Sequence, residues 1–265
     1  MRSFIVTTSL GKQSEAVKQA RWLSTELGVS YVPRGKDSLE TLQEKYGVSG
    51  IVVVTNQKVC LFSGGKRFFF HPDLAKVRIK GLRTGKTDQM VKAMDLRPGD
   101  EVLDCTLGLA SDALVASYVV GDTGRVVGLE AVKLIAVLVR DGLQKYPARP
   151  ADLAAAMHRI EVVWVDYNDF LRQLDDNSFD VVYFDPMFRC PVMTSDSMVP
   201  LRALADPRPL DAGSLREAYR VARKRVVFKE RRGSPEFVRL GFNDVEGGKY
   251  ASVAYGVLKK DGTGQ

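Results

Sequence analysis

The apolar positions along the chain alternate between two periods, and this alternation predicts the order of the elements. In the larger, second part of the sequence, short apolar runs typical of buried strands are separated by segments with apolar residues at helical spacing. The predicted strands are 101–105, 124–130, 160–166, 179–185, 225–229 and 252–259. The predicted helices are 84–96, 111–120, 132–146, 168–174, 214–221 and 235–240. Strands that alternate with helices predict an α/β fold with a doubly wound, Rossmann-like sheet.

The first 80 residues carry shorter strand and helix signals. A strand is predicted at 3–8, helices at 14–27 and 38–46, a hairpin at 50–62 and a further strand at 67–70. We therefore expect a small N-terminal α+β domain over 1–80, which is a candidate for RNA binding or for a lid. The Rossmann-like domain is expected over 81–265.

The composition is that of a soluble globular protein, with 45% apolar and 27% charged residues among 265. No run approaches about 18 consecutive apolar residues, and the N-terminus lacks the features of a signal peptide. The three cysteines, Cys60, Cys105 and Cys190, are odd in number and far apart, which fits neither a disulfide framework nor zinc ligands. We expect a cytoplasmic protein with reduced cysteines, no membrane span and no metal.

The net charge of +7 is concentrated in two basic runs, one between 66 and 86 and one between 220 and 232. Such runs suit a polyanion as partner, although solvated surface positions give the same pattern. If the partner is RNA, the candidate contacts in and near these runs are Lys66, Arg67, Arg78, Lys80, Lys229 and Arg231.

A turn follows the first strand of the larger domain, in the segment DCTLGLASD from Asp104 to Asp112. A dinucleotide fold would need the glycine pattern GxGxxG here to admit a pyrophosphate. Only Gly108 is present, and Ala110 and Ala113 fill the other two places. The turn therefore argues against a dinucleotide and suits a ligand without phosphates.

Acidic residues end the next two strands as well. Glu130 lies about 20 residues beyond the turn, where an acid can accept both ribose hydroxyls of a nucleoside. Asp166 ends the third strand and suits an adenine amine. Each acid, taken singly, is also explained as a helix N-cap or a solvated strand end. Together, at the carboxyl ends of successive strands, the acids predict a nucleoside site.

The fourth strand ends in Asp185-Pro186-Met187-Phe188. An amino group conjugated to a base ring is a weak nucleophile because its lone pair is delocalised. A carboxylate and a backbone carbonyl that accept its two hydrogens localise that lone pair, and an aromatic such as Phe188 can stack on the base. Pro186 stiffens the loop. These residues predict a catalytic loop for an amine acceptor, although a plain strand-to-loop turn has the same local pattern.

At this point the chain resembles a known family, the bacterial guanine-N2 methyltransferases of small-subunit ribosomal RNA (small subunit methyltransferase J) and their Gram-positive relatives. The similarity rests on the turn Asp-x-Thr-x-Gly-Leu, on Glu130, on Asp-Pro-Met-Phe and on Lys224-Arg-Val-Val-Phe-Lys229, and it covers roughly 70–260. The resemblance implies a class I methyltransferase domain and S-adenosyl-L-methionine as cofactor. It also implies a guanine amine of small-subunit ribosomal RNA as acceptor.

The resemblance assigns a role to each motif residue. Cofactor binding is implied for Asp104, Thr106, Gly108, Asp112, Glu130 and Asp166, and catalysis for Asp185, Pro186, Met187 and Phe188. Two alternatives remain open: a methyltransferase that acts on a protein or a small molecule, and a non-catalytic RNA-binding factor with a methyltransferase fold. The chain departs from the family pattern at Ala110, where a second glycine is usual, and at Arg189, where a proline is usual.

Overall fold

The computed structural model describes residues 3–11, 14–186 and 208–260. It contains two compact units. The first comprises, among the described residues, 3–11, 14–71 and 133–147, and the second comprises 72–132, 148–186 and 208–260. Across these ranges, no helix is both long and apolar enough to cross a membrane.

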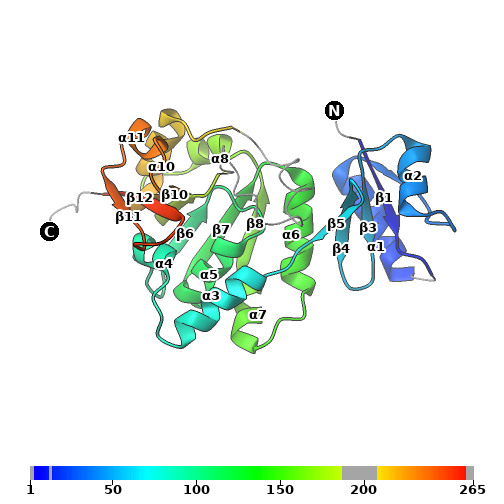
Figure 1. Cartoon of the computed structure of the whole chain (residues 1–265), viewed down its shortest axis with the longest axis horizontal. Coiled ribbons are helices and arrows are strands. Elements are labelled where there is room, and N and C mark those ends of the chain that lie inside the picture. The colour runs from blue at the N-terminus through cyan, green and yellow to red at the C-terminus, as the bar shows by residue number, and fades with distance from the viewer. Residues whose placement is uncertain (1–2, 12–13, 187–207, 261–265) are drawn as a thin grey trace. The chain divides into compact units, whose positions relative to one another are not determined.

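The first unit is a five-stranded sheet with helices (Figure 1). Its strand order is β2-β1-β3-β4-β5, with β1, β2 and β3 parallel and β4 and β5 antiparallel. The strands are β1 (Phe4–Thr8), β2 (Ser30–Tyr31), β3 (Gly50–Val54), β4 (Val59–Ser63) and β5 (Lys66–Phe69). The helices are α1 (Ser14–Leu27), α2 (Leu39–Tyr46) and α6 (Lys133–Lys145). The short alternating signals predict a small α+β domain here, but the unit also includes α6, which the sequence pattern placed in the larger domain.

The second unit is built on a seven-stranded sheet with the order β11-β12-β10-β9-β6-β7-β8. The strands are β6 (Glu101–Asp104), β7 (Arg125–Glu130), β8 (Ile160–Trp164), β9 (Phe179–Phe184), β10 (Ala222–Arg231), β11 (Asp244–Glu246) and β12 (Val253–Lys259). The helices are α3 (Asp73–Arg83), α4 (Gln89–Met94), α5 (Ser111–Val120), α7 (Ala151–His158), α8 (Tyr167–Gln173), α10 (Ala212–Val221) and α11 (Glu236–Arg239). The five strands from β10 to β8 are parallel, and β12 is antiparallel to β10.

The strand order reverses at β6, because β7 and β8 lie on one side of it and β9 and β10 on the other. In open α/β sheets the ligand binds at such a switch point, beyond the carboxyl ends of the strands. This order confirms the predicted doubly wound sheet, and it places the turn after β6 at the centre of the expected site.

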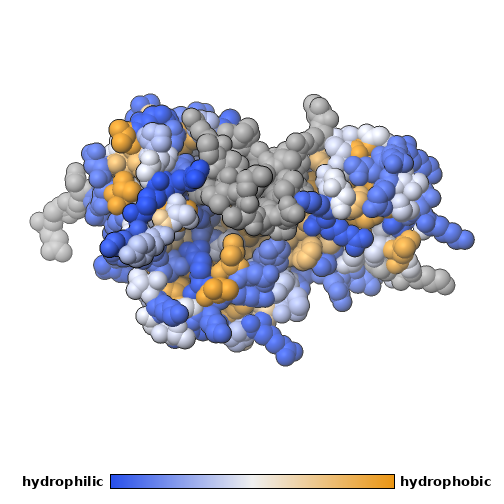
Figure 2. Space-filling view, in the orientation of Figure 1, coloured by the Kyte–Doolittle hydropathy of each residue, from blue (hydrophilic) through white to orange (hydrophobic). Residues whose placement is uncertain are grey.

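Side chains alternate between the two faces of the sheet, and each face has its own helices (Figure 1). Leu103, Val182 and Phe228 point to the face that α8 and α10 cover, where they join a core with Leu171 and Leu215. Their neighbours one residue along each strand point to the opposite face. The apolar side chains of the core are buried, whereas hydrophilic residues predominate on the face shown in Figure 2.

The helices α3 and α7 were not predicted, and another helix is shorter than predicted. Helix α3 occupies a basic run and buries Ala75 and Ile79, whereas the apolar Leu74 and Val77 face solvent, so its apolar spacing is incomplete. The helix predicted at 84–96 is the six-residue α4, because Asp88 caps it by accepting hydrogen bonds from the N–H groups of Met90 and Val91. The domain boundary expected after residue 80 falls within α3, whose residues belong to the second unit.

Candidate functional site

The turn after β6 is held by a buried carboxylate. Asp104 is 1% exposed, and its Oδ1 accepts a hydrogen bond from the Thr106 N–H at 3.0 Å. Burial raises the pKa of Asp104 to about 8, with the Thr106 N–H opposing the rise and the carboxylates of Asp112 and Asp185 adding to it. Asp104 is therefore mostly protonated at neutral pH, and a cation placed beside it would favour its ionised form.

Two residues in the turn have left-handed backbone conformations. Gly108 has φ +50°, and a Cβ atom placed there would meet only the Thr106 carbonyl, at 3.8 Å. Ala110 has φ +58°, immediately before α5. A non-glycine residue in this region costs about 1–2 kcal/mol. Ala110 therefore carries this strain at the residue that precedes α5.

Glu130, at the end of β7, connects the turn to the neighbouring strand by hydrogen bonds. One carboxylate oxygen accepts the Gly108 N–H at 3.2 Å, and the other accepts the Val132 N–H at 2.8 Å. The residue is 9% exposed. Each carboxylate oxygen thus accepts a main-chain hydrogen bond, and the two contacts orient the group.

Asp166 has a structural role that the sequence analysis left open. It is the N-cap of α8, accepting the Asn168 N–H at 2.8 Å, and it pairs with Arg208. Burial opposes the ionisation of Asp166, but Arg208 and the Asn168 N–H outweigh it and hold its pKa below the usual range. A polar cavity of about 550 Å³ lies beside it, lined by residues of α8 and α10. An adenine amine would have to compete with Arg208 for this carboxylate.

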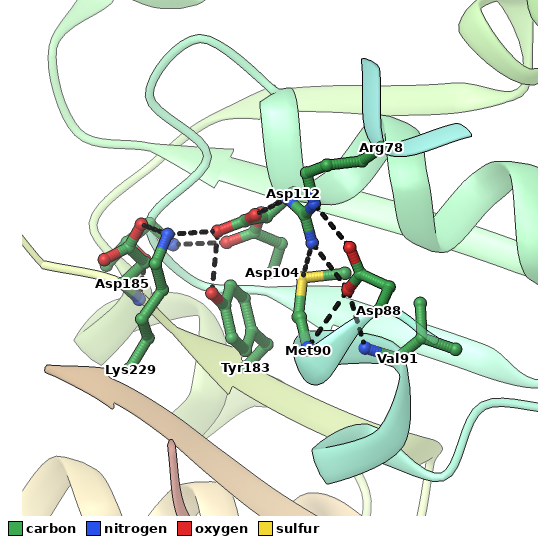
Figure 3. Close-up of polar contacts among 10 residues, drawn as sticks. Arg78, Asp88, Met90, Val91, Asp104, Asp112, Tyr183, Asp185 and Lys229 are labelled. Carbon is green, nitrogen blue, oxygen red and sulfur yellow. Dashed lines mark hydrogen bonds and ion pairs between the residues drawn. The ribbon is translucent and has the colours of Figure 1, made fainter. Parts of the chain in front are cut away.

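A second group of charged residues lies at the same strand ends, on the face of the sheet opposite α8 and α10. Asp104 is paired in register with Tyr183, and Phe228 is paired with Phe184, so the following residues of β10 and β9 also lie side by side. As a result Lys229 meets Asp185, with its Nζ 2.7 Å from Oδ2 (Figure 3). Strand register thus brings together groups that are far apart in sequence.

We call this group the ionic cluster and define it as Arg78, Asp88, Asp112, Asp185 and Lys229 (Figure 3). Asp112, in the first turn of α5, is its centre: it pairs with Arg78, with Lys229 at 2.9 Å and with the Tyr183 hydroxyl at 2.7 Å. Burial opposes the ionisation of Asp112, but Lys229 and Arg78 outweigh it and hold its pKa below the ordinary value. Asp112 is therefore a carboxylate saturated by donors.

Arg78 extends the cluster to the N-terminus of α4. Its Nε and Nη2 both bond to the carboxylate of Asp88, at 2.7 and 2.9 Å, while Nη1 pairs with Asp112. Such a two-pronged contact fixes the position of both partners. Burial acts against the charge on Arg78, but the two carboxylates outweigh it and raise its pKa.

Asp185 is the most accessible carboxylate of the cluster, with 27% of its side chain exposed. Its main-chain N–H donates to the Thr106 hydroxyl at 2.6 Å, so the catalytic loop and the cofactor turn are directly connected. Desolvation raises the pKa of Asp185 to about 6, with Lys229 opposing the rise and Asp112 adding to it. Pro186 follows, half-buried, and Met187 and Phe188 lie outside the described residues.

The residues predicted to contact RNA fall into two groups. Arg78 and Lys229 are committed to ion pairs within the ionic cluster, and their side chains are 25% and 18% exposed. The other four are exposed, and they are Lys66 and Arg67 on β5, Lys80 on α3 and Arg231 at the end of β10.

Sequence reasoning did not find Asp88 or Tyr183. Asp88 carried a local signal, since it directly precedes an apolar helical run, as N-caps do. Tyr183 carried none, because a tyrosine in an apolar strand looks like a core residue. Its hydroxyl is placed at Asp112 only by the packing of α5 on the sheet.

The residues at the strand ends fit S-adenosylmethionine. The turn contains two acids and no basic side chain of its own, although Arg78 and Lys229 pair with one of these acids, Asp112. Asp104 would hold the ammonium group and Glu130 the ribose hydroxyls, and only the Thr106 carbonyl lies within 4 Å of a Cβ atom placed at Gly108. When bound, the cofactor supplies an electrophilic methyl group on a positively charged sulfur. The chain itself supplies a partly exposed carboxylate, Asp185, beside the turn.

Comparisons with known proteins agree with this interpretation. The family model "Putative SAM-dependent methyltransferase" matches residues 68–239. The chain is 45% identical to protein YpiP of Bacillus subtilis over 256 residues, which are 96% of this chain and 99% of that protein. It is 34% identical over 176 residues to the ribosomal RNA small subunit methyltransferase J of Dechloromonas aromatica, covering 63% of this chain and 68% of that enzyme.

The fold has a counterpart among solved structures. A SAM-dependent methyltransferase of Neisseria gonorrhoeae superposes with a TM-score of 0.67 at 19% identity, covering 99% of this chain and 98% of that one. This similarity extends over both units of the chain. The family match, the acids at the strand ends and this shared fold lead to one conclusion: the chain belongs to the SAM-dependent methyltransferase family, and S-adenosyl-L-methionine is its cofactor.

Proposed function

We propose that this methyltransferase modifies the exocyclic amine of a base in small-subunit ribosomal RNA, with guanine N2 as the favoured acceptor. The observation that carries the proposal is Asp185, a partly exposed carboxylate that is tied to the cofactor turn through Thr106 and followed by Pro186. An aromatic amine needs acceptors for its hydrogens before its lone pair can attack, whereas oxygen and carbon acceptors do not. Methyltransferases named for small-subunit ribosomal RNA are among the relatives of the chain, which supports the same substrate class.

The substrate is tested by mapping methylated nucleotides in ribosomal RNA from cells with and without the protein. We expect one methylated guanine of the small-subunit RNA to disappear without the protein and to return with the wild-type chain but not with Asp185→Ala. Purified protein with labelled cofactor should then transfer methyl groups to the RNA pool and not to pools of protein, DNA or metabolites. Transfer to protein or metabolites alone would replace this proposal with another acceptor.

The first unit offers a basic strand that suits the RNA. Lys66 and Arg67 are exposed on β5, an edge strand, and Lys58 places its Nζ 3.6 Å from the centre of the Phe69 ring on the same strand. Basic side chains beside an aromatic ring are a combination that binds single-stranded nucleic acid. We therefore infer that β5 contributes to RNA affinity and not to methyl transfer itself.

A charge reversal on β5 tests this role. The double variant Lys66→Glu, Arg67→Glu is expected to weaken RNA binding by about tenfold or more. It should also lower the salt dependence by about one unit of slope for each phosphate that is no longer neutralised. Cofactor affinity should not change. Lys18→Glu, Lys45→Glu on α1 and α2 is the matched control, since it makes the same charge change on exposed residues of the same unit. Equal RNA affinity in the two double variants would remove β5 from the RNA site.

A further inference from the structure

Lys229 is a buried ammonium shared by two carboxylates. Its Nζ lies 2.7 Å from Asp185 and 2.9 Å from Asp112, and 18% of its side chain is exposed. Asp185 and Asp112 are drawn with Lys229 between them in Figure 3. Two carboxylates this close would repel one another without a cation, because most of the surface of both side chains is shielded from solvent. Lys229 therefore makes the arrangement possible.

The two carboxylates depend on Lys229 to different degrees. Asp112 also receives the Arg78 guanidinium and the Tyr183 hydroxyl. Within the described part of the chain, Lys229 is the cation that contacts Asp185. Removal of the ammonium would leave Asp112 paired, but it would leave Asp185 beside a second negative charge. The effect of Lys229 is thus concentrated on the carboxylate that faces the acceptor.

We propose that Lys229 is a positioning residue that holds the side chain of Asp185 as an oriented carboxylate, ready to accept hydrogen from the substrate amine. This inference rests on the proposed function only for the identity of that substrate. Asp112, anchored by Arg78, in turn holds the other side of the Lys229 ammonium. The ionic cluster then forms a chain of alternating charges that ends at the acceptor site.

Proton balance explains why the charge state of Asp185 matters. Methylation forms a bond between carbon and the amine nitrogen and breaks the bond between carbon and sulfur, and one hydrogen of the amine departs as a proton. A carboxylate can accept that hydrogen, whereas a neutral carboxylic acid presents its own proton instead. Lys229 keeps Asp185 in the accepting form near neutral pH.

Other charged or titratable groups also face this carboxylate. Among the described residues they are Asp104 from β6, Asp112 from α5, Tyr183 from β9, Lys229 from β10 and, through Lys229, Tyr255 from β12, with Arg78 and Asp88 one step further away. Burial raises the pKa of Asp185, Lys229 lowers it and Asp112 adds to the rise. The pKa of about 6 is thus a balance that single substitutions shift in opposite directions.

The test compares pH profiles of kcat/KM for the wild-type protein and Lys229→Met. In the wild type, activity should be lost as pH falls through the pKa of Asp185, about 6. Without the ammonium that pKa rises, so the acid limb of the kcat/KM profile should move up by about 1–3 pH units. The variant should then have little activity at neutral pH and recover activity at alkaline pH. A loss of equal size at every pH would mean that Lys229 is merely structural, and it would overturn the proposal.

Three further variants sharpen the result. Lys229→Arg keeps the charge and should keep the acid limb within about half a pH unit of its wild-type position. Asp112→Asn removes a negative charge beside Asp185, so the limb should move down, opposite to Lys229→Met. Lys224→Met is the matched control, because Lys224 bridges Asp100 and Asp180 at the other end of the same strand and should leave the limb unchanged. If Lys229→Met does not fold, an unshifted limb in Asp112→Asn still contradicts the proposal.

A second measurement needs no substrate at all. Carbon-13 NMR of protein labelled at the aspartate carboxyl carbon reports the titration of Asp185 directly, with Asp185→Asn to assign the signal. Lys229→Met should move that titration upward in the protein alone. If the shift appears but no RNA is methylated, the proposed acceptor is wrong and the role of Lys229 stands. If RNA is methylated but the titration does not move, the role of Lys229 is wrong and the acceptor stands.

Discussion

Asp185→Ala is expected to lower the rate of methyl transfer by about 100-fold or more, the range typical of removing an acid–base group. The affinity for the cofactor should change by no more than about threefold, which corresponds to about 0.7 kcal/mol of binding free energy. The reason is structural: the turn is fastened to this loop through the main-chain N–H of Asp185, which donates to Thr106 and is retained in the variant. Removal of the side chain therefore leaves this hydrogen bond to the turn in place.

Two measurements separate these effects. Transfer of a labelled methyl group to RNA under single-turnover conditions gives the rate, and calorimetric titration with S-adenosylmethionine gives the affinity. Asp176→Ala is the control, since Asp176 is an exposed acid whose ion pair with Arg220 lies outside the site. Retained turnover in Asp185→Ala would show that the carboxylate takes no part in the reaction. A large drop in cofactor affinity would show instead that it contributes to cofactor binding.

Glu130→Gln is expected to have the opposite effect: it should lower the affinity for the cofactor by about 10- to 100-fold. Glutamine can accept only one of the two main-chain hydrogen bonds, from Gly108 and Val132, that the carboxylate accepts. Its amide nitrogen would face the other N–H, and hydrogen bonds to a charged acceptor are each worth about 1.5–3 kcal/mol. The substitution should therefore weaken both the hydrogen bonds that hold the turn and the contact to the ribose.

At saturating cofactor the rate of methyl transfer in Glu130→Gln should approach that of the wild type, since the ionic cluster is intact. The affinity is measured by calorimetry and the rate by single turnover at high cofactor concentration. Glu161→Gln is a close control, because Glu161 is an exposed acid on the adjacent strand β8, paired with Arg125. An affinity equal to that of the wild type would place the ribose elsewhere.

Local patterns were sufficient for the five parallel strands of the larger sheet and for the acids that end four of them, but they did not predict the short strands β2 and β11. The alternation of strands and helices predicted the doubly wound sheet, and Asp104, Glu130 and Asp185 were identified from their positions at strand ends. This works because parallel strands of one sheet present their carboxyl ends at a common edge, so position in the strand gives position in space. The absence of GxGxxG from the turn then distinguished the cofactor from a dinucleotide.

The roles of the basic residues could not be predicted in this way. Arg78 and Lys229 were interpreted as phosphate contacts because each lies in or near a basic run. In the structure Arg78 comes from α3, a helix the pattern did not predict, and Lys229 comes from β10, and both meet Asp112 of α5. A charge count along the chain contains no information about which acid will lie opposite each base.

The sequence by itself determined the fold class, the cofactor turn and the acid at the end of each central strand, because these depend on local periodicity and on the common direction of parallel strands. Only the tertiary structure decided that Asp112, Lys229 and Asp185 form one cluster and that the Tyr183 hydroxyl belongs to it. Strand order, register and the packing of α3 and α5 set those contacts, and each joins residues distant in sequence. The pKa values of Asp104 and Asp185 follow from the same packing, since burial and neighbouring charges act through space and not along the chain.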